Sequence, residues 1–159
     1  MIPSPGIFAR SAVTALFLLS LVVSAVAADI SFARDKLRLL TGAGPRDLTV
    51  ELAVDPAQRE QGMMYRRQMA PDHGMLFDFG ETRRVMMWMK NTYLPLDMLF
   101  VARDGTVRTI HENAVPLSEA IIDSGEPVAF VLELNAGTVR RLGIKPGDRL
   151  EGSRVPAAN

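Results

Sequence analysis

Cysteine is absent from the 159-residue chain. Its absence excludes disulfides, a thiol nucleophile, thiolate metal ligands and a bacterial lipoprotein anchor. Histidine is scarce, because the chain has only His73 and His111, which lie far apart in sequence. An excess of charge is also missing, since 18 basic residues balance 18 acidic ones. A chain without net positive charge has no electrostatic preference for nucleic acid or an acidic membrane surface, so no nucleic-acid partner is expected.

The sequence also lacks the specific motifs of several enzyme classes. It contains no Gly-x-Ser-x-Gly nucleophile turn, no phosphate-binding P-loop, no Gly-x-Gly-x-x-Gly and no His-Glu-x-x-His. Because these motifs are specific to their chemistries, their absence excludes the common hydrolase, nucleotide-binding and zinc-protease patterns. These absences favour a protein that is not an enzyme, and no cofactor is expected.

Residues 1–28 differ in character from the rest of the chain. A short head is followed by an apolar stretch over residues 12–23 and then by Ala25-x-Ala27, a small-x-small cleavage pattern. This is typical of a secretory signal peptide cut near Ala27 or Ala28. The apolar stretch is shorter than the about 20 residues of a membrane-spanning helix, although an uncleaved anchor is the alternative. We expect a periplasmic or secreted protein without stable membrane insertion once the signal is removed.

The chain that remains after residue 28 is long enough for one domain with its own core. We expect an extension with a first strand and turn over 29–45, a single β domain over 46–152 and a flexible tail over 153–159. Asp55, Pro56 and Gln58 form a helix start with a capping box, which predicts a helix to about residue 68.

Alternating or continuous apolar stretches bounded by turn residues predict several short strands. They cover residues 36–40, 46–54, 75–79, 84–90, 96–102, 107–112, 127–134 and 149–152. A second short helix is predicted within 136–142, and a helical turn within 116–127. This pattern predicts a mainly β fold with one packed helix and an α+β tendency, as a compact antiparallel β-barrel or a jelly-roll-like sandwich.

Two carboxylates interrupt apolar runs. Asp97 lies within Leu94–Val101, and Glu133 lies within Val131–Leu134. A carboxylate in such a place is partnered, has a raised pKa or lines a cavity. If strands 84–90 and 96–102 form a hairpin, Asp97 lies near Lys90, as a structural ion pair or as part of a polar ligand site. The two carboxylates are also candidate catalytic residues, because a pair about 5–9.5 Å apart can hydrolyse a glycosidic bond.

Eight of the nine methionines lie between Met63 and Met98. In an exported protein, thioethers are soft ligands suited to Cu(I), and Trp88 could cap the ion by cation–π contact. The metal candidates are Met86, Met87 and Met89. The competing interpretation is that methionine is a flexible filler of the core.

Several blocks of the chain occur together in order and form a family pattern. They are Gln58–Arg66, Gly74–Phe79, Trp88–Thr92 with Pro95–Asp97, Val131–Leu134 with Ala136–Gly137, and Gly143–Asp148. The chain closely resembles the DUF192 family, a family of unknown function. The resemblance implies a compact β-rich barrel or jelly-roll-like fold with a helix packed against it, and it implies no reaction. Met87 stands where family members often have an aromatic residue.

The leading hypothesis is a non-catalytic binding module for a small molecule, with a carbohydrate or glycan fragment as a fitting ligand. Its expected site residues are Trp88, Lys90, Asn91, Thr92, Tyr93, Asp97 and Glu133. Three alternatives stay open: a hydrolase that uses Asp97 and Glu133, Cu(I) binding through clustered methionines, and a purely structural role for the polar residues. The sequence does not predict an oligomeric state.

Overall fold

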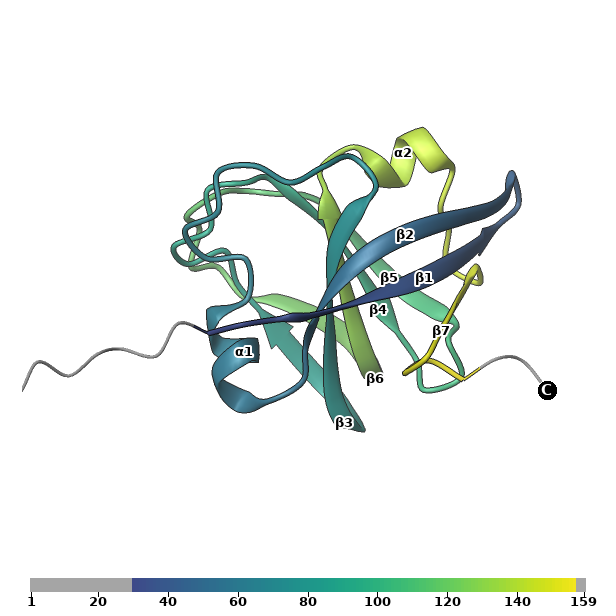
Figure 1. Ribbon diagram of the computed structural model, residues 1–159, viewed down its shortest axis with the longest axis horizontal. Coiled ribbons are helices and arrows are strands. Elements are labelled where there is room, and N and C mark those ends of the chain that lie inside the picture. Colours follow the sequence, from purple (N-terminus) through teal and green to yellow (C-terminus); the bar gives the residue numbers. More distant parts are fainter. Residues whose placement is uncertain (1–29, 157–159) are drawn as a thin grey trace, which may run out of the picture.

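The computed structural model describes residues 30–156 (Figure 1). The signal peptide predicted over 1–28 and the last three residues lie outside the described residues. The elements are β1 (Ala33–Thr41), β2 (Gly44–Ala53), α1 (Pro56–Gln61), β3 (His73–Met87), β4 (Leu96–Val101), β5 (Val107–Ala114), β6 (Ile122–Asn135), α2 (Thr138–Leu142) and β7 (Arg149–Gly152). Within residues 30–156, no helix is long and apolar enough to cross a membrane.

One curled sheet contains all seven strands, in the order β5-β4-β6-β3-β2-β1-β7. Its two edges approach each other, because Thr106 beside β5 forms a bridge with Arg149 of β7. The curl gives the molecule a barrel-like shape in which β1 and β2 cross in front of the other strands (Figure 1). The predicted mainly β, barrel-like fold is confirmed, and α2 (Thr138–Leu142) is the second short helix predicted within 136–142.

One pair of neighbouring strands, β2 and β3, runs parallel. Parallel neighbours need a crossover connection, and here α1 and the segment 62–72 provide it. The crossover covers one face of the sheet, where Met63 packs with Met75, Phe77 and Met98 in a buried cluster. A second buried cluster, which includes Leu76, Leu99 and Leu132, fills the opposite face.

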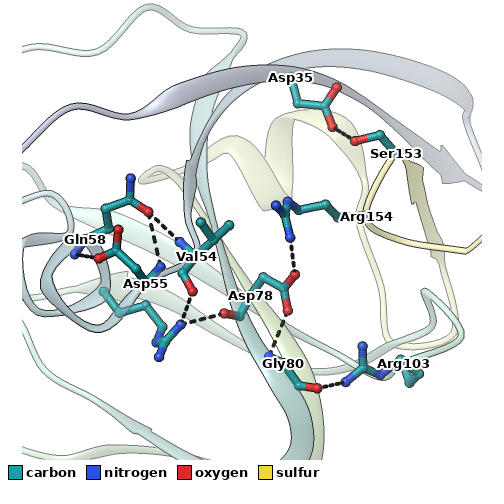
Figure 2. A network of polar contacts seen from close by, with 10 residues as sticks. Asp35, Val54, Asp55, Gln58, Asp78, Gly80, Arg103, Ser153 and Arg154 are labelled. Carbon is teal, nitrogen blue, oxygen red and sulfur yellow. Dashed lines mark hydrogen bonds and ion pairs between the residues drawn. The ribbon is translucent and has the colours of Figure 1, made fainter.

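Helix α1 starts as the sequence predicts but is shorter than expected. Asp55 accepts a hydrogen bond from the Gln58 backbone N–H, and the Gln58 side chain completes the capping box (Figure 2). The helix ends at Gln61 and not near residue 68, because Gly62 leaves the helical conformation with φ of 46°. The ring of Phe77 packs so closely on Gly62 that an added Cβ would lie 3.1 Å from it.

Strand pairing differs from the hairpin that the sequence suggests. The segments 75–79 and 84–90 belong largely to one long strand, β3, whose register shifts between Asp78 and Arg83. Strand β4 pairs with β5 and β6, so it does not form a hairpin with the end of β3. The connection before β6 contains turns and no helix within the described residues.

The chain remains packed beyond β7. Val155 is fully buried, Ser153 donates a hydrogen bond to Asp35, and Arg154 forms an ion pair with Asp78 at 3.0 Å (Figure 2). Residues 153–156 therefore continue the folded domain, although the sequence assigns them to a flexible tail.

Candidate functional site

A cleft with two compartments lies between α1 and the segment that follows β3. The inner compartment has a volume of about 120 Å³, and the outer, more open one has about 390 Å³. Their shared wall consists of Glu60, Gln61, Met64, Trp88 and Lys90. We call these the inner and outer compartments.

Glu133 lines the inner compartment from the central strand β6. Only 4% of the residue is exposed, and within residues 30–156 its Oε2 atom has no hydrogen-bond partner. Burial raises the pKa of the Glu133 carboxyl to about 8, and the nearby Arg66 opposes this shift. A buried carboxyl without a partner is costly, so this residue marks the cleft as a candidate site.

Trp88 and Lys90 form the wall nearest to solvent. Trp88 is 43% exposed, and the Lys90 Nζ atom lies 5.2 Å from the centre of its indole ring, at cation–π distance. Lys90 forms no ion pair with any residue of the described chain. The pair thus presents an aromatic surface and a free ammonium group to the outer compartment.

Three connecting loops hold this wall in place. The Tyr65 N–H donates to the Asn91 carbonyl at 2.9 Å, and the Leu117 N–H donates to the Thr92 carbonyl at 3.1 Å. The Asn91 side chain donates to the Tyr65 hydroxyl at 3.0 Å. Tyr65, Asn91 and Leu117 all have positive φ angles, which cost energy in residues other than glycine and often accompany functional sites.

The predicted ligand residues are divided between the cleft and other places. Thr92 lines the inner compartment and Asn91 the outer one. Tyr93 lines neither compartment. Its ring lies at the periphery against Tyr65, with 6.4 Å between ring centres, and beneath Arg67.

Asp97 lies on the other face of the sheet. In the pairing of β4 with β6, Asp97 is opposite Leu134 and Met98 is opposite Glu133, and adjacent residues of a strand point to opposite faces. Asp97 is fully buried and accepts hydrogen bonds from the backbone N–H groups of Asn113 and Val139, each at 2.9 Å. The structure therefore does not assemble Asp97 and Glu133 as an acid–base pair.

Methionines contribute to the inner compartment, but the set differs from the predicted one. Met63, Met64, Met86 and Met87 line it, whereas Met89 is 1% exposed, packs in the core and does not line it. Sequence reasoning noted Met63 and Met64 within the methionine-rich region but did not name them as ligands. Only the crossover after α1 reveals that they face the end of β3.

A larger hollow of about 430 Å³ lies between β2 and the segment 66–70. Its charged groups are already paired, because Glu51 contacts Arg66 in an ion pair and lies 3.9 Å from Arg34. The cleft beside Trp88 is the better candidate site, since it contains an unpartnered carboxyl and an unpaired ammonium among the described residues.

The fold and the cleft define a small β protein with a barrel-like sheet and a buried carboxyl at a surface recess. The chain belongs to the DUF192 family, described as an uncharacterized ACR, whose model matches residues 38–152. No curated protein is similar enough to give a match.

Two solved structures show the same fold. A protein from Sinorhizobium meliloti 1021, described as a "putative transcription regulator", is 79% identical, with a TM-score of 0.77 over 79% of this chain and 98% of that one. A protein of unknown function from Novosphingobium aromaticivorans is 34% identical, with a TM-score of 0.73 over 79% of this chain and 89% of that one.

Proposed function

We propose that this DUF192 protein is a non-catalytic binding module and that a glycan end is the ligand of its outer compartment. The observation that carries the proposal is the half-exposed Trp88 with the free ammonium of Lys90 above it, at the wall of an open recess. Binding sites for small molecules combine apolar or aromatic walls with a few fixed polar groups, and this recess has that composition.

The size and the chemistry of the outer compartment suit a sugar. Its volume of about 390 Å³ falls in the range of small-ligand pockets, which is roughly 300–1,000 Å³. Trp88 offers a flat apolar surface for a sugar ring, while Glu60, Lys90 and Asn91 line the recess with charged and amide groups for hydroxyls. The separation of Asp97 from Glu133 removes the catalytic pair that hydrolysis was predicted to use.

The proposal also includes the location where this binding takes place. The signal-peptide pattern of residues 1–28 supports a periplasmic or secreted protein, so glycans of the cell envelope are the ligands to test. The relative described as a "putative transcription regulator" raises DNA as an alternative. The balance of 18 basic and 18 acidic residues supplies no electrostatic preference for it.

Thermal melts of the purified protein against a panel of cell-envelope glycan fragments, with a DNA duplex included, test this function. A ligand at 100 times its Kd adds about 2.7 kcal/mol, which raises Tm by several degrees in a domain of this size. For a glycan that raises Tm, titration calorimetry is expected to show at least a tenfold weaker affinity for Lys90→Ala, because the ammonium contact is lost.

Lys145→Ala is the matched control, since Lys145 is exposed in the turn before β7 and does not line the cleft. The control is expected to bind like the wild type. A glycan panel without any Tm shift, or equal affinities for both lysine variants, would contradict the proposal, and a shift with DNA alone would favour nucleic-acid binding.

A further inference from the structure

We propose that the inner compartment is a site for a soft monovalent metal cation, Cu(I) by its chemistry. The thioethers of Met63, Met64 and Met87 and the carboxylate of Glu133 are its ligands. This site adjoins the glycan recess across the wall that the two compartments share, but it does not depend on the glycan proposal.

The ligand set comes from three segments that the fold brings to one small cavity. Met63 and Met64 follow α1, Met87 ends β3 and Glu133 lies near the end of β6. The Asn91 amide nitrogen lies 3.9 Å from the Met64 sulfur atom, which helps to orient it. Thioethers are soft ligands that favour Cu(I) over Zn²⁺ or Mg²⁺. No group of three or more His, Asp or Glu side chains suited to a metal occurs in residues 30–156.

The small volume of the inner compartment favours an ion over an organic ligand. At about 120 Å³, against about 390 Å³ for the outer compartment, it lies below the roughly 300–1,000 Å³ of pockets that bind small organic ligands. Its walls also contain the rings of Phe77, Phe79 and Trp88.

The charges around the compartment permit a cation. Glu133 provides the buried carboxyl whose Oε2 lacks a partner among the described residues. The Arg59 guanidinium is held by the backbone carbonyls of Val54 and Asp78, and the Lys90 ammonium lies over the Trp88 ring. A bound cation would replace the proton of the Glu133 carboxyl, and that proton would leave to solvent.

Trp88 is the only tryptophan of the chain and lines the compartment, so its fluorescence reports on the site. We expect Ag(I), the redox-stable stand-in for Cu(I), to quench Trp88 emission with a stoichiometry of one and a Kd of micromolar or below. Native mass spectrometry gives the stoichiometry independently. Met64→Leu and Met87→Leu are each expected to weaken Ag(I) binding at least tenfold, and Glu133→Gln is expected to weaken it as well.

Met69→Leu is the matched control, because Met69 also lies in the methionine-rich region but lines the separate hollow beside β2. It is expected to bind Ag(I) like the wild type. Circular dichroism of each variant confirms that it is folded. Absence of a one-to-one Ag(I) complex in the wild type, or an equal loss of affinity in all three leucine variants, would overturn the proposal.

Different results would contradict the metal proposal and the glycan proposal. Lys90→Ala is expected to weaken glycan binding at least tenfold and to leave a one-to-one Ag(I) complex, whereas Met87→Leu is expected to weaken Ag(I) binding at least tenfold and to leave glycan binding unchanged. An Ag(I) affinity lost in Lys90→Ala and kept in Met87→Leu would place the metal outside the inner compartment and would also overturn the proposal.

Discussion

Glu133 shows how one residue can connect the stability of the protein to its site. The carboxyl lies in an otherwise apolar stretch of β6, where six neighbouring positions are buried with it. Only 4% of the residue is exposed, and this burial accounts for the raised pKa of the carboxyl.

The raised pKa predicts that stability falls as pH rises. Between the ordinary pKa of 4.5 and the folded-state value of about 8, the folded protein retains a proton that the unfolded chain has released. Folding in this window therefore takes up a proton, and the free energy of unfolding decreases with increasing pH by a total of about 5 kcal/mol. The loss is complete above the folded-state pKa.

Urea unfolding at pH 5.5 and pH 9 measures this effect. Glu133→Gln stays neutral at both pH values, so it is expected to be more stable than the wild type at pH 9 and to lose most of this advantage at pH 5.5. Glu126→Gln is the control, because Glu126 is exposed, and it is expected to follow the wild type. A wild-type stability that does not fall relative to Glu133→Gln between the two pH values would contradict the prediction.

At the scale of elements, helix α2 depends on a side chain from another strand. Its N-cap residue is Gly137, which offers no side-chain cap. Instead, Asp97 of β4 accepts a hydrogen bond from the Val139 N–H near the start of the helix. It accepts a second one from the Asn113 N–H near the end of β5. The carboxylate thus satisfies two backbone donors and joins three elements.

Asp97→Ala is expected to lower the free energy of unfolding by about 3–5 kcal/mol. Each hydrogen bond to a charged acceptor contributes about 1.5–3 kcal/mol, and its loss here leaves buried N–H groups without a partner. Urea unfolding with an unchanged m-value measures the loss. Asp47→Ala removes an aspartate from an exposed ion pair with Arg38 and is expected to cost no more than about 1 kcal/mol. Equal losses in the free energy of unfolding for the two variants would show that Asp97 does not cap helix α2 from strand β4.

The same scale shows which elements the sequence could predict. Alternating apolar residues in β2 and the capping box at Asp55 are local signals, and the structure has both elements where they were expected. The helix end at Gly62 was missed because a glycine that ends a helix and one inside it are the same residue in sequence, and only the structure shows its φ of 46°. The prediction of a hairpin between β3 and β4 was wrong, because β6 lies between them in the sheet. The adjacency of two strands in sequence does not determine their order in the sheet.

The candidate site belongs to the scale of the whole molecule. Trp88, Lys90 and Glu133 could be singled out in the sequence as polar or aromatic residues in unusual places, and the cleft brings them together. Met63 and Met64 could not be assigned to it, because their proximity to Met87 follows from the parallel pairing of β2 with β3. Asp97 had the same local signal as Glu133, and only the register of β4 on β6 separates the two.

The curl of the sheet is fixed where its edges meet, and Gly105 occupies that position. The Leu150 N–H donates to the Gly105 carbonyl at 2.7 Å, and the Val107 N–H donates to the Asp148 carbonyl at 2.8 Å. Gly105 has a φ of 85°, and an added Cβ would lie 2.3 Å from the Leu150 carbonyl oxygen. An alanine there must push β7 away from the turn between β4 and β5.

Gly105→Ala is therefore expected to lower the free energy of unfolding by about 3 kcal/mol or more, which combines left-handed backbone strain with overpacking. Gly125→Ala is the matched control, because Gly125 has a φ of 72° but no atom within 4 Å of an added Cβ, and it is expected to cost only the strain of about 1–2 kcal/mol. Hydrogen exchange should show faster exchange of the Leu150 and Val107 amides in Gly105→Ala alone, because both amides donate across the junction. Equal protection of these amides in the two variants would mean that the edge contact does not hold the curled sheet closed.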